Sequence, residues 1–119
     1  MILRWHIPGV LSETGVVNTD VQGNAYRLDA DYVPDEVWIR VKTASQGVSG
    51  TGITLDINDD GVSIFRQNPS LPDNTQSITC NTFQPGVLLE GSVITLDVDS
   101  VGKEYAGNDL TVELSLAED

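Results

Sequence analysis

The chain is short of cysteine and of long hydrophobic runs, and each shortage excludes a class of protein. With Cys80 as its only cysteine, it forms no internal disulfide and no zinc site built on cysteine pairs. No apolar stretch approaches the roughly 20 residues of a membrane-spanning helix. The N-terminus, MILRWHIPGV, lacks the continuous apolar region and small-residue cleavage site of a signal peptide, so we expect no processing and no secretion.

Basic residues are also scarce. Six Lys and Arg face 18 Asp and Glu, which gives a net charge of −12. Such a surface repels phosphate backbones and anionic lipids, so we expect neither a nucleic-acid nor a membrane partner. A high net charge keeps a protein soluble and suppresses non-specific association. It is also compatible with a basic protein partner or with divalent cations.

Few side chains offer reactive chemistry. Cys80 lies in a strand-like segment and is expected to be a small buried apolar side chain, because its only possible base, His6, is far away in the sequence. A single histidine makes no metal site, so we expect His6 at the surface or at an interface. Asp97 and Asp99 share a strand face, and paired carboxylates serve glycoside hydrolysis. Solvated charge already explains this pair, and we expect neither an enzyme nor a cofactor.

Apolar and polar residues alternate with period two over most of the chain, which is typical of strands with one buried face. The alternating segments are residues 1–8, 25–33, 36–44, 52–66, 75–83, 93–101 and 109–116. Turn residues such as Pro8-Gly9 and Pro34-Asp35 separate them, and no segment has helical periodicity. The sequence therefore predicts one all-β domain over residues 1–119. It would be an antiparallel β-sandwich, jelly-roll or Greek-key like, of seven to eight strands, with residues 9–24 as an extended arm or loop.

The clearest hairpin spans residues 52–66, GITLDINDDGVSIFR. Its Asp56, Asn58 and Asp60 match the opening half of an EF-hand calcium loop. The twelfth position of that loop is Gln67 rather than a bidentate Glu, and both flanks alternate as strands, so an EF-hand is rejected. A looser cation site from Asp56, Asn58 and Asp60 is the alternative to a plain hairpin turn, which by itself explains these residue types.

Trp38 is expected on the outside of the sandwich. If Val37 and Ile39 face the core, Trp38 lies on the opposite face of its strand with Arg40 and Lys42. An outward tryptophan beside two bases is typical of a contact surface, for a protein or for a glycan. The aromatic side chains that can stack on a sugar ring are Trp5, Tyr26, Tyr32, Trp38 and Tyr105. Aromatic side chains also build β-sandwich cores, and we expect Trp5 to face inward.

Three motifs carry a family resemblance. They are W-x-x-P-G-V-L over residues 5–11, L-D-I-N-x-D-G-x-S-I-F over residues 55–65, and G-S-V-I-T-L-D-V-D-S-V-G…G-N-D-L-T-V-x-L over residues 91–114. Together they resemble small β-sandwich proteins encoded among the structural genes of tailed bacteriophages. Such modules serve as capsid decoration (cement) proteins and as domains of tail or fibre proteins. The resemblance spans nearly the whole chain and brings no catalytic residues with it.

The resemblance implies a virion structural protein, most simply a capsid decoration protein that stabilises the head by binding the major capsid protein. It further implies a homotrimer at or near a local threefold axis, assembled in the host bacterial cytoplasm and located in the virion. Contacts would come from residues 9–24, residues 45–52 and Trp38. The alternatives are a tail, collar or fibre component that binds other virion proteins, or a carbohydrate-binding module at the virion surface.

Overall fold

The computed structural model describes residues 1–12, 25–47 and 52–119, and these form strands and loops without a helix. Most of the predicted arm, residues 13–24, lies outside the described residues. The strands are β1 (Ile2–Val10), β2 (Tyr26–Arg27), β3 (Tyr32–Thr43), β4 (Ile53–Asp59), β5 (Val62–Ser63), β6 (Ser70–Leu71), β7 (Ser77–Cys80), β8 (Val93–Ser100) and β9 (Asn108–Glu118). No helix long and apolar enough to cross a membrane occurs in this part of the chain.

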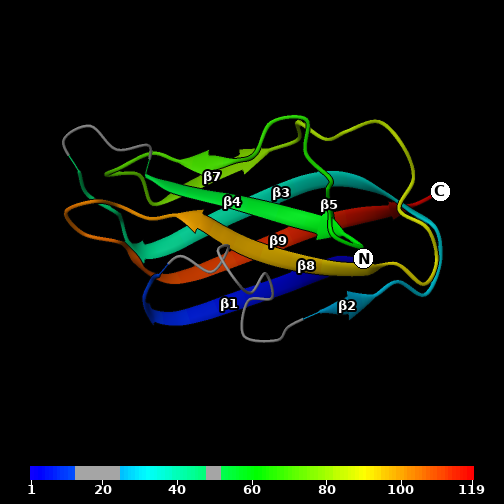
Figure 1. Ribbon diagram of the computed structural model, residues 1–119, viewed down its shortest axis with the longest axis horizontal. Coiled ribbons are helices and arrows are strands. Elements are labelled where there is room, and N and C mark those ends of the chain that lie inside the picture. The colour runs from blue at the N-terminus through cyan, green and yellow to red at the C-terminus, as the bar shows by residue number, and fades with distance from the viewer. Residues whose placement is uncertain (13–24, 48–51) are drawn as a thin grey trace.

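The strands form two antiparallel sheets packed face to face, so the predicted all-β sandwich is confirmed (Figure 1). The four-stranded sheet has the order β1-β9-β3-β7. The five-stranded sheet has the order β2-β8-β4-β5, and β6 pairs with the other end of β4. The last strand, β9, lies between β1 and β3, so the first and last strands of the chain are neighbours in the sheet.

The core lies between the two sheets and is built by the alternation seen in the sequence. Val37 and Ile39 of β3 and Leu55 and Ile57 of β4 are buried in one continuous apolar cluster. Trp5 of β1 is also fully buried, as predicted. Its ring meets that of Tyr26 edge to face at 5.3 Å between ring centroids.

The predicted hairpin is present. Asp60 and Gly61 form its turn with φ angles of 49° and 86°, and two consecutive positive φ angles are typical of a tight two-residue turn. Asp60 ties the turn to β8, because its backbone N–H donates to the Val93 carbonyl and its Oδ1 accepts from the Val93 N–H, both at 3.0 Å. The returning strand β5 is only two residues long.

Three predictions are wrong: the strand over residues 25–33 and the turns at Pro34-Asp35 and Pro8-Gly9. The segment 25–33 is not one strand, because only Tyr26–Arg27 pairs with β8. A bend follows at residues 29–30, and β3 begins at Tyr32 and continues through Pro34-Asp35. The pairing with β9 shifts between Pro34 and Glu36, and such a bulge accommodates a residue without an N–H. In the same way β1 runs through Pro8-Gly9 with a shift between Ile7 and Val10, which an edge strand permits.

The two glycines at the ends of β4 provide a matched test of the packing. Gly52 and Gly61 both have positive φ. A Cβ on Gly52 would lie 2.1 Å from the Leu71 carbonyl oxygen, whereas a Cβ on Gly61 would have no atom of residues 1–12, 25–47 or 52–119 within 4 Å apart from its chain neighbours. We expect Gly61→Ala to lower the free energy of unfolding by about 1–2 kcal/mol from backbone strain alone. Gly52→Ala should cost roughly 3 kcal/mol or more, since the backbone must also move. Urea unfolding measures both, and equal losses would contradict the close approach.

Candidate functional site

Trp38 lies on the outer face of the four-stranded sheet, as the alternation predicts. Its neighbours Val37 and Ile39 are fully buried, while Trp38 is partly exposed. Across the sheet, Trp38 is paired with Glu113 of β9 on one side and with Thr79 of β7 on the other. A large aromatic side chain is therefore held at the middle of a four-stranded surface.

Basic side chains from two strands share this face. Arg40 and Lys42 follow Trp38 along β3 and are exposed. Arg4 of β1 is paired with Glu113 and forms an ion pair with it, donating from Nε to Oε2 at 2.6 Å. Next to it His6 contacts Thr111, with 3.0 Å between Nδ1 and Oγ1. We call this surface, defined by Arg4, His6, Trp38, Arg40 and Lys42, the Trp38 face.

The Trp38 face is far less acidic than the rest of the protein. It carries three of the six Lys and Arg residues and the only histidine. The acids that its strands place on the same side are Glu36, Glu113 and Asp109, and Asp35 is exposed at the bulge beside Glu36, which makes four of the chain's 18. Asp109 already accepts a hydrogen bond from the Gly9 N–H at 2.8 Å. A chain with net charge −12 thus presents one sheet surface on which positive and negative side chains nearly balance.

The candidate cation ligands are not brought together. Asp56 accepts a hydrogen bond from the Ser63 hydroxyl at 2.6 Å. Asn58 is buried and donates from Nδ2 to Asp97 Oδ2 at 2.8 Å, and Asp60 bonds the Val93 backbone. Each of the three side chains has its own partner within the fold. Among the described residues no group of three or more histidine, cysteine or acidic side chains is placed to hold a metal ion.

Asp97 and Asp99 differ in a way that their spacing does not reveal. Both point to the outer side of the five-stranded sheet, but Asp97 is only 5% exposed whereas Asp99 is exposed. The interpretation of both as solvated charges is therefore wrong for Asp97, which accepts the bond from Asn58. This buried pair links β4 and β8 through their side chains.

Cys80 and His6 lie on opposite edges of the four-stranded sheet, on β7 and β1, with β3 and β9 between them. They cannot form a nucleophile and base pair in this arrangement. Cys80 is half-buried and packs against the core, and burial raises the pKa of its thiol. A raised pKa makes the thiol a weaker nucleophile at neutral pH.

The other aromatic candidates for sugar stacking are occupied. Trp5 and Tyr32 are buried, and the Tyr32 hydroxyl donates to Asp29 Oδ1 at 2.6 Å. That contact with a carboxylate raises the pKa of Tyr32 to about 12. Tyr26 packs on Trp5, and Tyr105 accepts a hydrogen bond from Asn108 at 2.8 Å. Of the five, Trp38 alone stands in the centre of an open sheet face.

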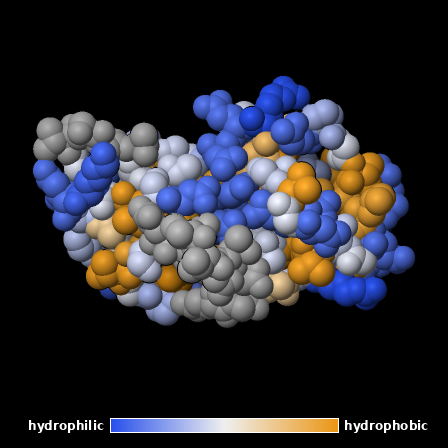
Figure 2. Space-filling view, viewed as in Figure 1, coloured by the Kyte–Doolittle hydropathy of each residue, from blue (hydrophilic) through white to orange (hydrophobic). Residues whose placement is uncertain are grey.

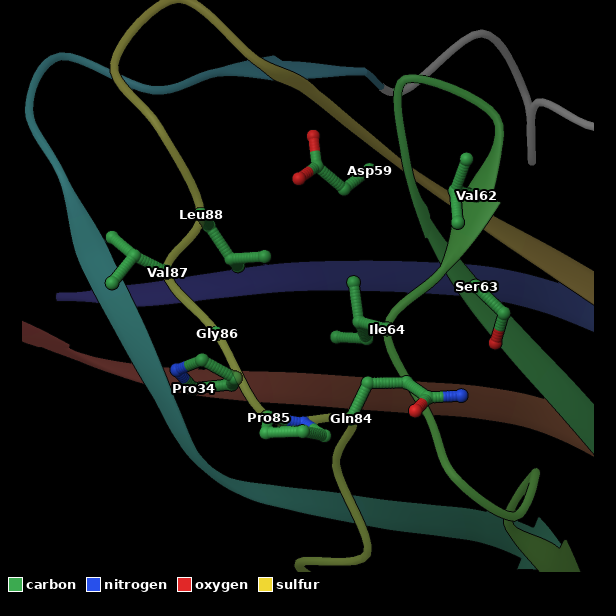
Figure 3. A pocket seen from close by; sticks show the side chains of 10 residues that line it. All are labelled: Pro34, Asp59, Val62, Ser63, Ile64, Gln84, Pro85, Gly86, Val87 and Leu88. Carbon is green, nitrogen blue, oxygen red and sulfur yellow. The ribbon is translucent and has the colours of Figure 1, made fainter.

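A feature that the sequence did not indicate lies at one end of the sandwich. A cavity of about 150 Å³ opens between the start of β3, the β4–β5 hairpin and the segment 84–88 (Figure 3). Its walls include Asp59, Val62, Ile64, Val87 and Leu88. The lining comes from three separate parts of the sequence, Pro34, residues 59–64 and residues 84–88, and no periodicity or motif joins them.

Comparisons of the chain with models of protein families, with curated proteins and with solved structures found no match.

Asp56 gives a pH-dependent prediction. Burial raises the pKa of its carboxyl group, the Asp99 charge adds to this, and the Ser63 hydrogen bond opposes it. A folded-state pKa above the unfolded value means that ionised Asp56 costs stability at pH 7, and that this cost disappears as the pH falls below about 4. We therefore expect Asp56→Asn to raise the free energy of unfolding at pH 7 but not at pH 3.

Urea unfolding at the two pH values measures this effect. Asp35→Asn is the matched control, because it removes the same charge from an exposed position. An Asp56→Asn variant no more stable at pH 7 than Asp35→Asn would show that burial of the Asp56 carboxylate carries no cost.

Proposed function

We propose that this chain is a structural protein of a tailed-bacteriophage virion, and specifically a capsid decoration protein that binds the major capsid protein. The observation that carries the proposal is the Trp38 face: a nearly charge-balanced sheet surface with a central tryptophan on an otherwise acidic protein. The motif resemblance across residues 5–11, 55–65 and 91–114 supports the class of protein. The two-sheet fold agrees with that class.

The chemistry of the Trp38 face suits burial against a protein. Tryptophan and arginine are the residues that most often dominate the energy of protein interfaces, and Trp38 and Arg40 are neighbours on one face. Balanced charge lowers the electrostatic cost of bringing this face against another surface, whereas the remaining acidic surface repels copies that approach in other orientations. A decoration protein stabilises the capsid because it binds the assembled coat and not the dissociated one.

The proposal includes a homotrimer near a local threefold axis of the head. In that position each copy contacts more than one coat subunit, and binding therefore links neighbours that would otherwise separate. Assembly takes place in the host bacterial cytoplasm, and the protein resides in the virion. Residues 9–24 would supply further contacts.

Binding to capsids that lack this protein tests the proposal. The full chain should sediment with such capsids in a stoichiometric ratio. Trp38→Ala should weaken binding by about tenfold or more, as for a tryptophan at the centre of an interface. Arg40→Ala should also weaken binding, while its matched control Arg66→Ala, exposed but outside the Trp38 face, should not.

Failure of the unaltered chain to bind would overturn the decoration role. Equal losses of binding in Arg40→Ala and Arg66→Ala would show that the contact lies outside the Trp38 face.

Antibody labelling of whole virions separates the alternatives within the same class, since an antibody to a tail, collar or fibre component labels the particle away from the head. The glycan alternative rests on the exposure of Trp38 alone. It requires hits on a glycan array that Trp38→Ala abolishes.

A further inference from the structure

One end of the sandwich combines exposed apolar side chains with a cavity. Three segments meet there: the start of β3, the β4–β5 hairpin and residues 84–89. Hydrogen bonds hold them together, since Tyr32 and Leu88 exchange backbone bonds of 2.8 and 2.9 Å and the Gln84 N–H donates to the Ile64 carbonyl at 2.8 Å. The arrangement of this end is therefore fixed by backbone pairing.

Apolar side chains are concentrated at this end. Half of the eight large hydrophobic residues that are exposed in the described part of the chain lie here: Val33, Val62, Val87 and Leu89. We call these four residues, together with the cavity that Val62 and Val87 help to line, the end surface. Figure 2 shows apolar surface at the right-hand end of the molecule, bordered by hydrophilic atoms, and a second apolar area at the lower left. Val62 is 70% exposed and Leu89 59%, values that suit contact with another molecule rather than a role in this fold.

The cavity is lined by apolar and polar side chains together, and Asp59 is the one carboxylate in its lining. Ile64 and Leu88 are buried and point into the space that Figure 3 shows, with Asp59 on its wall. The Asp59 oxygen Oδ1 is removed from solvent and has no hydrogen-bond partner among the residues that the structure describes. A buried carboxylate oxygen without a donor costs free energy, and a cation in the cavity close to the Asp59 carboxylate would offset part of this cost through its charge. A volume of about 150 Å³ holds a group the size of benzene.

The surroundings of the end surface are acidic. Beside Val33 and Leu89 lies a second, open hollow that is lined by Ala30, Asp31, Glu90, Glu118 and Asp119. Asp60 borders Asp59 at the tip of the hairpin. Arg27 is the base nearby, with a guanidinium nitrogen 3.8 Å from the position that a Cβ on Gly91 would take. Negative charge around an apolar cavity excludes an anionic occupant and favours a cationic one.

We propose that the end surface docks a segment of a partner protein that places one lysine side chain in this cavity between two apolar residues. The lysine methylenes pack on Val62, Val87 and Leu88, and its ammonium group donates to Asp59. Lysine commonly buries its aliphatic stem while its charged end reaches a polar group. The flanking apolar residues of the segment cover Val33 and Leu89. This surface is separate from the Trp38 face, and the proposal does not depend on the capsid role.

A small-molecule titration tests the lysine pocket directly. The full chain, with methyl groups labelled for NMR, is titrated with n-butylammonium chloride, which reproduces a lysine side chain. We expect the methyl signals of Val62, Val87 and Leu88 to shift with a dissociation constant on the order of 1–10 mM. The neutral analogue 1-butanol should bind about tenfold more weakly, because it lacks the charge-assisted hydrogen bond, and pentanoate should not bind.

The Asp59→Asn variant should bind n-butylammonium only as tightly as the unaltered chain binds 1-butanol. An amide NMR spectrum of the variant that is unchanged away from residue 59 verifies that it is folded. Val87→Ser, at an exposed position, should weaken both ligands. Equal binding of pentanoate, absence of shifts up to about 50 mM, or shifts confined to Ala30 and its neighbours would each overturn the proposal.

Two peptides test the docking of a segment. In an extended chain alternate side chains point the same way, so acetyl-Val-Gly-Lys-Gly-Val-amide directs its lysine and both valines to one side. It should bind more tightly than n-butylammonium and shift Val33 and Leu89 as well. The same peptide with glutamate at its centre should not bind. A lysine peptide that binds no more tightly than n-butylammonium would refute the segment, whatever the result with capsids.

Discussion

The pairing of β9 along both of its edges is the constraint on which the rest of the structure depends. β9 joins β1 and β3 into one sheet. The three strands are all far apart in the sequence. Its leucines at 110 and 114 are fully buried against the other sheet, while Glu113 between them faces outward. The N-terminal ammonium group donates to the Leu116 carbonyl at 3.0 Å, and so the two ends of the described chain are held together. Without β9, Arg4 and Trp38 would not share a surface, because Glu113 is the residue that lies between them.

The two candidate surfaces arise from different parts of the architecture. The Trp38 face follows from strict alternation, since a strand that buries Val37 and Ile39 must turn Trp38 outward. Its composition is then set by what β1 and β9 place beside it. The end surface follows from the connections between the sheets, where the hairpin and the segment 84–89 close one end of the sandwich. In a regular strand, packing constrains only the side chains that face the core. The residues of the end surface are instead positioned by backbone pairing between loops. The exposed valines of that surface have no role in the core.

The sequence predicted most of what depends on local pattern. Alternation placed Trp38 outside and Trp5 inside, and turn chemistry located the hairpin turn within residues 58–61. The errors come from interactions between segments that are distant in the sequence. Tyr26 to Tyr32 alternate as a strand would, but Asp29 and Asp31 bond the Tyr32 hydroxyl and the Glu90 N–H and so stabilise a bend. The pattern alone assigns Asp97 to the surface, because its burial depends on the hydrogen bond from Asn58, which lies diagonal to it on the neighbouring strand. The cavity of the end surface could not be predicted, because its three segments meet only through backbone pairing across the fold.

The relative position of the two surfaces bears on how the protein would hold a larger assembly. One surface lies on the flat side of a sheet and the other at the end of the sandwich, so a single copy can contact two neighbours without steric conflict between them. Once the first surface is bound, the second meets its partner at a high effective concentration, and two weak contacts then give a much stronger attachment than either alone. The charges keep the two contacts distinct. A nearly balanced face tolerates a broad protein surface, whereas the acidic end selects a cationic segment, so neither partner competes for the site of the other.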